Sequence, residues 1–424
     1  MNHKTISDRR EKLLGGGTPV FYEEPVHVVR GEGVWLFDAD GRKYLDMYNN
    51  VPCVGHSHPH VVAALSDQAS TLNVHSRYLH EGILNYAERL MELHINPLTS
   101  VVFSCSGTEA SEVAIRIARS VTGGQGIIGT NAGYHGNSAE VRKVTGRDAS
   151  TDFRTINFPQ TFRPLIENVG GSALTTLYLD QIESAIQAFK EQGTKLAGML
   201  VCSILANEGL PDIPIDFMPR AAEMVRNAGG LFIADEVQAG FCRTGHWWGY
   251  ETTDFLPDIV TMGKPMGNGF PLAATAARHK HITQFRKATG YFNTFASTPL
   301  QAAVGMAVLD VIEEENLQKN VIDVGSYLIT ELRGLQHSWE CMGDVRGHGL
   351  FVGIDWIQDY GTKFPDELGA VAVVNNLKDM GFLISNSGVH KNVLKIRPPL
   401  VFLREHADLF LSAFEETLKE LYAN

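Results

Sequence analysis

The segments Leu231-Phe-Ile-Ala-Asp-Glu-Val-Gln238 and Ile259-Val-Thr-Met-Gly-Lys-Pro-Met-Gly-Asn-Gly269 share one pattern, a short apolar run that stops at a charged side chain. The first run stops at Asp235, and the second stops at Lys264, which lies between a glycine and a proline. Apolar runs of this length are typical of strands buried in a parallel sheet, where ligands gather at the carboxyl ends of the strands. The sequence therefore predicts a carboxylate and an amine at one edge of such a sheet.

This pair of side chains suits the chemistry of pyridoxal 5'-phosphate. A lysine can form a Schiff base with that cofactor, while an aspartate keeps its pyridine nitrogen protonated. Each residue also has a plainer interpretation, because an Asp after a strand is often a helix cap and a single Lys is usually a solvated surface residue.

Composition narrows the class of protein. A chain of 424 residues is too long for one ordinary hydrophobic core, so we expect two lobes. The net charge of -12 argues against nucleic-acid binding, which needs a basic face. Five scattered cysteines without CxxC spacing favour reduced thiols in a cytoplasmic protein. The polar first ten residues do not resemble a signal peptide, and the longest apolar stretch, 196–206, is too short to span a membrane.

The order of strand-like and helix-like segments predicts the fold class. From about residue 100, short apolar strands alternate with amphipathic helices, which implies a mainly parallel α/β sheet. The expected strands are 101–103, 126–129, 196–205, 231–234 and 258–262, and the expected helices are 108–119, 180–192 and 218–227. Asp180-Gln-Ile-Glu183 has the spacing of a capping box and is expected to open the helix 180–192. The expected strand 196–205 is followed by the expected helix 218–227.

The two chain ends are expected to form a smaller α+β lobe. Segments 26–30 and 33–45 suggest antiparallel strands with a turn at Asp40-Gly41, and 349–355 and 393–397 suggest further strands. We therefore predict that residues 1–60 and 320–424 build the small lobe and that residues 61–319 form the large domain. Segment 360–366 is expected to be an exposed loop.

Other motifs each have a plainer interpretation as well. Ser106-Gly-Thr108 follows a strand and opens a helix, which suits a phosphate but is also an ordinary N-cap. Tyr134-His135-Gly136 would place an aromatic ring near the same edge for a flat cofactor, although turn tyrosines are common. His56-Ser-His58-Pro-His60 fits a turn better than a metal site. The GxGxxG, P-loop and GxSxG patterns of other enzyme classes are missing from the sequence.

Taken in order, these residues resemble the class-III (ω-type) aminotransferases, which are pyridoxal-phosphate enzymes of fold type I. The resemblance runs over nearly the whole chain. It is carried by GHSHP at 55–59, SGTEA at 106–110, YHG at 134–136, ADEVQAGFCRTG at 234–245, MGKPMGNGFPLAA at 262–274, NTFASTPL at 293–300 and IRPPL at 396–400.

The resemblance implies a role for individual residues. Lys264 would form the Schiff base and move a proton, and Asp235 would pair with the pyridine nitrogen. Further cofactor contacts are implied for Ser106, Gly107 and Thr108 (phosphate), Tyr134 and Val237 (ring faces), His135 in the YHG motif, Gln238 (ring hydroxyl) and Thr294 (phosphate of the neighbouring subunit). Arg397 would bind a substrate carboxylate. Likeness to the family also suggests the walls of the substrate pocket, which are Asn49, Asn50, Pro52, Tyr78 and Trp248. The resemblance also implies a homodimer, with a tetramer as an alternative.

Segments 47–56, 72–80 and 387–397 most resemble one branch of the family, which holds the mitochondrial alanine–glyoxylate aminotransferases and the ethanolamine-phosphate phospho-lyases. One departure stands out. Where the family usually has a Glu that neutralises the arginine, followed by a Gln, this chain has Cys202 and Leu205. A buried guanidinium without a partner is costly, so we expect Arg397 either to require an anionic substrate group or to stay solvated.

The sequence thus predicts an aminotransferase that passes an amino group from an amine or amino acid to a 2-oxo acid, through a pyridoxamine phosphate form of the cofactor. The alternative from the same branch is a phospho-lyase that eliminates phosphate from an amino-alcohol phosphate. A cofactor-binding protein without turnover is a third interpretation, which the intact Lys264 and Asp235 disfavour.

Overall fold

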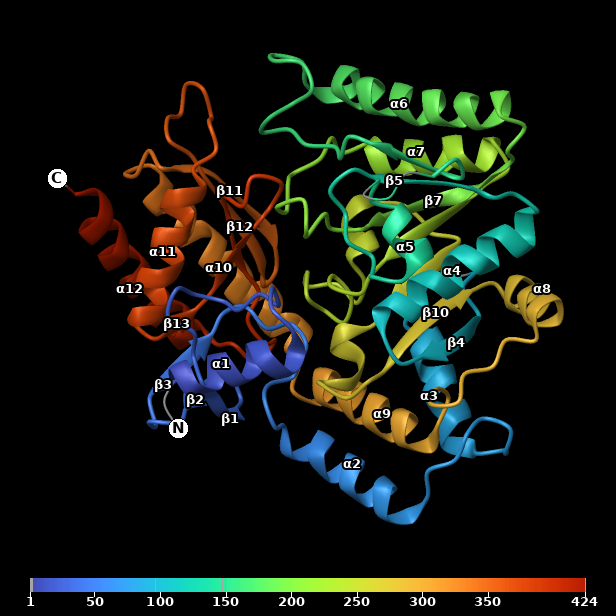
Figure 1. Cartoon of the computed structure of the whole chain (residues 1–424), viewed down its shortest axis with the longest axis horizontal. Helices are drawn as coiled ribbons and strands as arrows, with labels where there is room; N and C mark the ends of the chain where they lie inside the picture. Colours follow the sequence, from blue (N-terminus) through green and yellow to red (C-terminus); the bar gives the residue numbers. More distant parts are fainter. Residues whose placement is uncertain (1–2, 96, 147, 149, 424) are drawn as a thin grey trace.

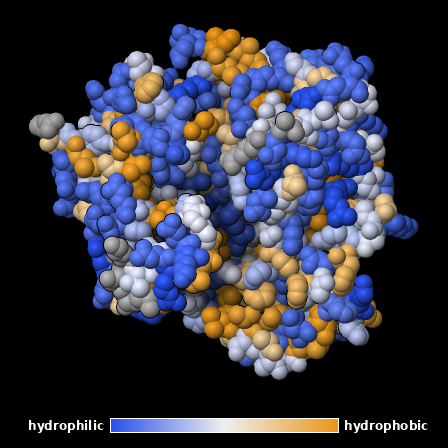
Figure 2. Space-filling model, viewed as in Figure 1, coloured by the Kyte–Doolittle hydropathy of each residue, from blue (hydrophilic) through white to orange (hydrophobic). Residues whose placement is uncertain are grey.

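Two lobes lie side by side, a large one built around a seven-stranded sheet and a small one built from both ends of the chain (Figure 1). The structure is a computed structural model and describes residues 3–95, 97–146, 148 and 150–423. Figure 2 shows a hollow between the two lobes whose visible surface is mostly hydrophilic.

The large sheet has the strand order β4-β10-β9-β8-β7-β5-β6. Only β10 runs against its neighbours, so the expected mainly parallel α/β sheet is confirmed. The strands are β4 (Ser100–Ser104), β5 (Gly126–Thr130), β6 (Phe153–Ile156), β7 (Leu196–Cys202), β8 (Leu231–Asp235), β9 (Ile259–Met262) and β10 (Ala273–Ala277). The third predicted strand was too long, because β7 ends at Cys202 and not at Leu205.

Helices cover both faces of this sheet, because successive strand residues point to opposite sides. Ile233 packs in a core cluster with residues of α4 and α8, whereas its neighbours Phe232 and Ala234 pack with residues of α6 and α7. The helices of the large lobe are α2 (Pro59–Thr71), α3 (Glu81–Glu92), α4 (Gly107–Thr122), α5 (Ala139–Lys143), α6 (Gly171–Glu191), α7 (Phe217–Asn227), α8 (His279–Thr289) and α9 (Pro299–Glu314), with 3-10 turns η1 (Gly249–Thr253) and η2 (Lys264–Gly267).

The predicted start of one helix was wrong. Asp180 does not cap α6 but lies in its middle, because the helix begins nine residues earlier at Gly171. Leu174 and Tyr178 precede Asp180 and are buried on the same face as Ile182, so the apolar period extends upstream of the apparent capping box. Helix α4 likewise runs to Thr122, where Gly123 ends it in a left-handed conformation with φ 67°.

The small lobe contains two four-stranded sheets, ordered β1-β2-β3-β13 and β11-β12-β15-β14. Its strands are β1 (Val28–Glu32), β2 (Trp35–Asp38), β3 (Lys43–Asp46), β11 (Met342–His348), β12 (Phe351–Trp356), β13 (Phe382–Leu383), β14 (Ser385–Ser387) and β15 (Val393–Ile396). Its helices are α1 (His3–Leu14), α10 (Leu317–Gln336), α11 (Glu367–Asp379) and α12 (Arg404–Tyr422). Strand β13 pairs in parallel with β3, which joins the two ends of the chain in one sheet.

The histidine-rich turn has no metal geometry. His56 pairs with Asp46 at 2.7 Å, His58 with Glu315 at 3.0 Å and His60 with Asp310 at 3.1 Å, so the three rings have three different carboxylate partners. In the segment 360–366, Tyr360 and Phe364 are exposed, as expected of a surface loop. No helix in the described part of the chain is long and apolar enough to cross a membrane.

Candidate active site

A cavity of about 210 Å³ lies at the carboxyl ends of the neighbouring parallel strands β8 and β9. It is lined by Gly107, Thr108, Tyr134, His135, Gly136, Asp235, Val237, Gln238 and Lys264. All of them belong to motifs singled out from the sequence. Residues from distant segments of the chain come together in this cavity because the ends of parallel strands share one edge of a sheet. The loops that follow the strands converge on that edge.

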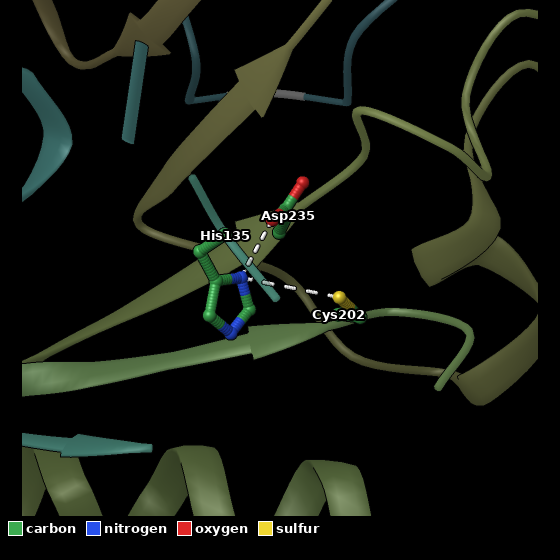
Figure 3. A group of neighbouring side chains, drawn as sticks. All are labelled: His135, Cys202 and Asp235. Carbon is green, nitrogen blue, oxygen red and sulfur yellow. Dashed lines mark hydrogen bonds and ion pairs between the residues drawn. The ribbon is translucent and has the colours of Figure 1, made fainter. Parts of the chain in front are cut away.

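Asp235, the last residue of β8, is held by two contacts (Figure 3). Its Oδ2 atom lies 2.6 Å from His135 Nδ1, and its Oδ1 accepts a hydrogen bond of 2.9 Å from the backbone N–H of Val237. Both side chains are buried. A carboxylate has about four acceptor positions, so two contacts leave capacity for one more donor such as a protonated pyridine nitrogen. The sequence indicated both residues but not their pairing.

Lys264 follows β9 after Gly263 and opens the short turn η2. Burial lowers the pKa of its amine, and the positive charge of Arg397 lowers it further, while Asp235 acts in the opposite direction. A lowered pKa increases the neutral fraction of the amine, which is the form that attacks a carbonyl carbon. Gly263 permits the close packing here, because a Cβ at this position would lie 3.2 Å from Val237 Cγ1.

The amino terminus of α4 supplies the third part of the cavity. Ser106 is the N-cap, and its hydroxyl accepts a hydrogen bond of 3.2 Å from the N–H of Glu109, so the plainer cap interpretation also holds. The first N–H groups of a helix lack partners within it, and Gly107 and Thr108 line the cavity at this point. A Cβ on Gly107 would lie 2.9 Å from Val237 Cγ1, so the backbone approaches closely only as glycine.

These groups fit pyridoxal phosphate. The residues present offer an acceptor for the ring nitrogen at Asp235, an amine for the aldehyde at Lys264, and helix-terminal N–H groups for the phosphate at Gly107 and Thr108. Tyr134 and Val237 also line the cavity, as flat-ring binding requires.

Arg397 lies beside this cavity and is buried, with 8% of its surface exposed. Its Nε donates to the Tyr48 carbonyl oxygen at 2.7 Å, its Nη1 donates to Gln238 Oε1, and its guanidinium stacks 4.3 Å from the centre of the Tyr48 ring. Burial lowers its pKa. It forms no ion pair with any described carboxylate, so it lacks a charged partner, as we expected from the sequence. The other possibility given above, that the guanidinium stays solvated, is wrong because Arg397 is buried.

Cys202 ends β7 directly beside Asp235 in the register of the sheet. Its Sγ lies 3.9 Å from His135 Nδ1 (Figure 3), and burial raises the pKa of the thiol. The side chain therefore contacts the pair of His135 and Asp235. Leu205 is buried in the core.

Four further residues suggested by the sequence have different environments. Asn50 is buried and its side-chain N–H donates to the Gln238 carbonyl oxygen at 3.3 Å, so it lies next to the cavity. Thr294 and Tyr78 are exposed and line a separate depression that also contains Phe295. The prediction that Trp248 forms a pocket wall was wrong. Its ring is buried and stacks on the His94 ring, with 4.0 Å between the two ring centres, and its Nε1 donates a hydrogen bond to the Leu93 carbonyl oxygen.

Two buried charged residues near this edge were not singled out from the sequence. Glu208 accepts a hydrogen bond of 2.9 Å from Thr130, and Lys395 is buried on β15. The alternation Lys395-Ile-Arg397 in a strand segment is the signal that would have placed the lysine beside the arginine.

Comparison with known proteins agrees with this geometry. The family model described as aminotransferase class-III matches residues 20–418. "Alanine--glyoxylate aminotransferase 2-like" of Drosophila melanogaster is 38% identical over 96% of this chain and 86% of that protein. "Ethanolamine-phosphate phospho-lyase homolog 1" of Caenorhabditis elegans is 34% identical over 97% of this chain and 93% of that protein.

A solved structure of a phospholyase from Arthrobacter in complex with phosphoethanolamine is 39% identical, covers 98% of this chain and 100% of its own, and superposes with a TM-score of 0.94. The family match, the relatives and the cavity agree on an enzyme that uses pyridoxal phosphate. The chain therefore belongs to the class-III aminotransferases, pyridoxal-phosphate enzymes of fold type I.

Proposed function

We propose that this enzyme is an aminotransferase that moves an amino group from an amine or amino acid donor to a 2-oxo acid. The observation that carries the proposal is the position of Lys264 and Asp235 on adjacent strand ends of one cavity, with the buried Arg397 beside it. The bound cofactor supplies a carbonyl carbon for the donor amine and an electron sink for the reaction.

Lys264 acts as the proton carrier. Its Nζ removes the proton from the Cα atom of the donor and later returns a proton to the corresponding carbon of the oxo acid. The amine has to be neutral before it accepts that proton, and the burial that lowers its pKa favours this state. Asp235 holds the ring nitrogen, and His135 fixes the carboxylate through its 2.6 Å contact.

Arg397 orients the carboxylate that amino acids and 2-oxo acids have in common. A guanidinium binds a carboxylate through two parallel hydrogen bonds. In the structure its side-chain partner is the neutral oxygen of Gln238. An anionic substrate group would replace that contact and would offset the cost of the buried charge. Asn50, which contacts the Gln238 backbone, then forms part of the wall around the substrate.

We further propose that the enzyme is a homodimer whose subunits complete each other's sites. Leu79 is fully exposed, and Phe295 and Tyr78 are largely exposed, which is unusual for apolar and aromatic side chains on a free surface. Figure 2 shows a hydrophobic area where α2 and α9 lie in Figure 1. In the proposed dimer, Thr294 of one subunit reaches the cofactor phosphate of the other. Sedimentation velocity at micromolar concentration tests this proposal, and a monomer would refute it.

The five cysteines support a proposed cytoplasmic location, since all of them are free in the structure. A measured thiol count on the native protein from cell extract tests this. A disulfide in that material would argue for an oxidising compartment.

A phospho-lyase is the second candidate. It is favoured by the likeness to the Arthrobacter phospholyase and by Cys202 at the position where the family usually has a Glu. The net reaction adds one water to an amino-alcohol phosphate and yields a carbonyl compound, ammonia and inorganic phosphate. The C–O bond breaks, and phosphate leaves with its electron pair. No 2-oxo acid is consumed.

One experiment separates the two candidates. The absorbance spectrum of the holoenzyme is followed with amino acids, ω-amines and phosphoethanolamine while 2-oxo acids are left out. An aminotransferase would change its cofactor spectrum permanently and release one equivalent of carbonyl product per site. Continuous release of phosphate and ammonia, with the starting spectrum regained, would refute the first proposal in favour of the second. A holoenzyme that changes with none of these amines would refute both.

A further inference from the structure

A thiol, an imidazole and a carboxylate point toward one another at one end of the cofactor cavity (Figure 3). The ligand atoms of Cys202, His135 and Asp235 all lie within 4.8 Å of one another, and no other group of three such side chains occurs among the residues that the structure describes. His135 Nδ1 lies 2.6 Å from Asp235 Oδ2 and 3.9 Å from Cys202 Sγ. The proposed mechanism uses the imidazole and the carboxylate but gives the thiol no part.

The large sheet holds these side chains in place. Cys202 and Asp235 are partners in the register of the parallel strands β7 and β8, so their side chains leave the sheet on the same face. His135 lies in the loop after β5, which pairs with β7 on its other side. All three residues are buried. Asp235 Oδ1 accepts the N–H of Val237, which leaves Oδ2 for the group.

The spacing is close to that of the ligands around a zinc ion. Tetrahedral zinc with bonds of about 2.0–2.3 Å places neighbouring ligand atoms roughly 3.3–3.7 Å apart. The 2.6 Å contact has to open and the 3.9 Å contact has to close, each by less than about 1 Å, which side-chain rotation supplies. His135 and Asp235 line the cavity, so a water on the cavity side completes the fourth position.

The charges around the thiol favour a cation. Burial raises the pKa of Cys202, the charges of Asp235, Glu208 and Glu236 raise it further, and Lys264 acts in the opposite direction. Negative charge that disfavours a bare thiolate favours a divalent cation bound to it. Zn²⁺ with one thiolate, one carboxylate and one neutral imidazole carries no net charge. Its burial therefore avoids the cost of an isolated ion.

The second ring nitrogen of His135 lies near a further carboxylate. In the described structure His135 Nε2 is buried and has no hydrogen-bond partner. It borders Gly133, where an added Cβ would lie 3.0 Å from His135 Nε2 and 3.3 Å from Glu208 Oε1. A metal at Nδ1 leaves the ring proton on Nε2, and zinc-bound histidines present that N–H to a carboxylate, a carbonyl or water. Glu208 supplies the carboxylate here.

We infer that the cofactor-free enzyme binds one zinc ion through Cys202 Sγ, His135 Nδ1 and Asp235 Oδ2, and that zinc and cofactor exclude each other. Thiolate and imidazole ligands select Zn²⁺ over Mg²⁺ and Ca²⁺, which prefer oxygen ligands. Three metal–ligand bonds form, the S–H bond of Cys202 breaks, and its proton leaves to solvent. The exclusion rests on the proposed assignment of Asp235 to the ring nitrogen, because a metal-bound carboxylate no longer receives that nitrogen.

Cobalt(II) tests the ligand set directly, since it replaces Zn²⁺ in tetrahedral sites and absorbs light. The apoenzyme is titrated with Co²⁺ in a buffer without amines. One equivalent per chain should produce a thiolate-to-cobalt charge-transfer band in the near ultraviolet and intense d–d bands in the visible region, and Zn²⁺ should abolish both. A wild-type enzyme without the charge-transfer band would overturn the inference, and this measurement needs no variant.

A variant then assigns the metal to one thiol. Cys202→Ala should bind Zn²⁺ roughly a hundredfold more weakly than the wild type, because loss of an outer partner of a ligand alone costs about 10–100-fold. Competition with a chromophoric chelator measures the affinity. The matched control is Cys341→Ala, which removes another free thiol just before β11 of the small lobe and should leave zinc affinity unchanged. Equal affinity in the wild type and Cys202→Ala would overturn the inference.

Cofactor loading tests the exclusion. Zn²⁺ at one equivalent should slow the loading of wild-type apoenzyme with pyridoxal phosphate, and a chelator should restore the rate. Cys202→Ala should load at the same rate with and without this amount of zinc. Loading of the wild type that is unaffected by the bound ion would overturn the exclusion.

These outcomes are separable from the proposed function. Borohydride reduction of zinc-free, loaded enzyme, followed by peptide mapping, reports whether Lys264 carries the cofactor. A labelled Lys264 in an enzyme without the cobalt band refutes only the zinc site. An unlabelled Lys264 refutes the proposed function, and the cobalt band still decides the zinc site.

Discussion

His135 and Asp235 are 100 positions apart in the sequence, yet His135 Nδ1 lies 2.6 Å from the Asp235 carboxylate inside the protein. The imidazole comes from the loop after β5 and the carboxylate from the end of β8, so the parallel sheet brings them together. The contact fixes the direction in which the carboxylate presents its remaining oxygen lone pairs.

His135→Phe should therefore weaken cofactor binding without unfolding the protein. The buried Asp235 carboxylate loses one of its two contacts, which costs about 1–3 kcal/mol. Titration of apoenzyme with pyridoxal phosphate measures the change in dissociation constant. His135→Asn keeps a donor and should recover part of the affinity. Equal affinity in wild type and His135→Phe would show that the pair has no role in holding the cofactor.

Asp235→Asn should abolish most turnover while the protein still loads cofactor. A neutral amide does not hold the ring nitrogen protonated, so the loss in kcat is expected to be roughly a hundredfold or more. Single-turnover rates with the best donor measure it. Asp180→Asn, on the exposed face of α6, is the matched control and should behave as wild type. Near-wild-type kcat in Asp235→Asn would contradict its assignment.

Cys202→Glu should broaden the range of donors. A carboxylate at the end of β7 would partly neutralise the cations near Lys264, so ω-amines without a carboxylate should gain kcat/KM relative to α-amino acids. Cys202→Gln controls for size without charge. The measurement is the kcat/KM for an ω-amine divided by the kcat/KM for an α-amino acid. An unchanged ratio in Cys202→Glu would refute the idea that Cys202 restricts the range of donors.

Arg397→Met should shift the pH dependence of cofactor capture by Lys264. Burial lowers the pKa of this amine and the Arg397 charge lowers it further, so removing the charge raises that pKa. The neutral amine then appears at higher pH, and the rising limb of the rate of pyridoxal phosphate addition to apoenzyme should move to higher pH. If the pH dependence of this rate were unchanged in Arg397→Met, or shifted to lower pH, that would contradict an electrostatic effect of Arg397 on Lys264.

Glu236 should make the protein less stable as pH rises from about 4.5 to about 7. Burial raises its pKa from 4.5 to about 7, although it accepts N–H groups of Gly249 and Tyr250. In this pH window the unfolded chain loses the proton and the folded chain keeps it. The free energy of unfolding therefore falls by up to about 3 kcal/mol as the pH rises. Glu236→Gln should lack this dependence in urea unfolding at pH 5 and pH 8. Exposed Glu416→Gln should retain it.

The sequence was informative where a charged residue directly follows a short apolar run. Asp235 and Lys264 stop apolar runs, and this pattern alone was enough to assign both to the edge of the sheet. Strand β10 was not predicted, because Ala273-Ala-Thr-Ala-Ala277 lacks the branched and aromatic residues of typical strands. It is the second strand in the order of the large sheet, and helix α4 packs on it.

Contacts between distant segments could not be predicted from the sequence. The pairing of His135 with Asp235 depends on strand order, and the exposure of Tyr78 and Thr294 depends on surfaces that periodicity does not describe. In the sequence Lys395 resembles an ordinary strand lysine, whereas the register shows that it faces the large lobe and the structure gives it no partner among the described residues.

The parallel pairing of β13 with β3 determines the order in which the enzyme can mature. During synthesis Lys43–Asp46 leaves the ribosome more than 300 residues before Phe382–Leu383, the strand that completes its sheet. The large sheet has all its strands by Ala277 and can form first, because domains generally fold as units as the chain emerges. Arg397 and Lys395 arrive with the last strand. The arginine to which we assign the substrate carboxylate therefore joins the cavity only after the whole large sheet has been synthesised.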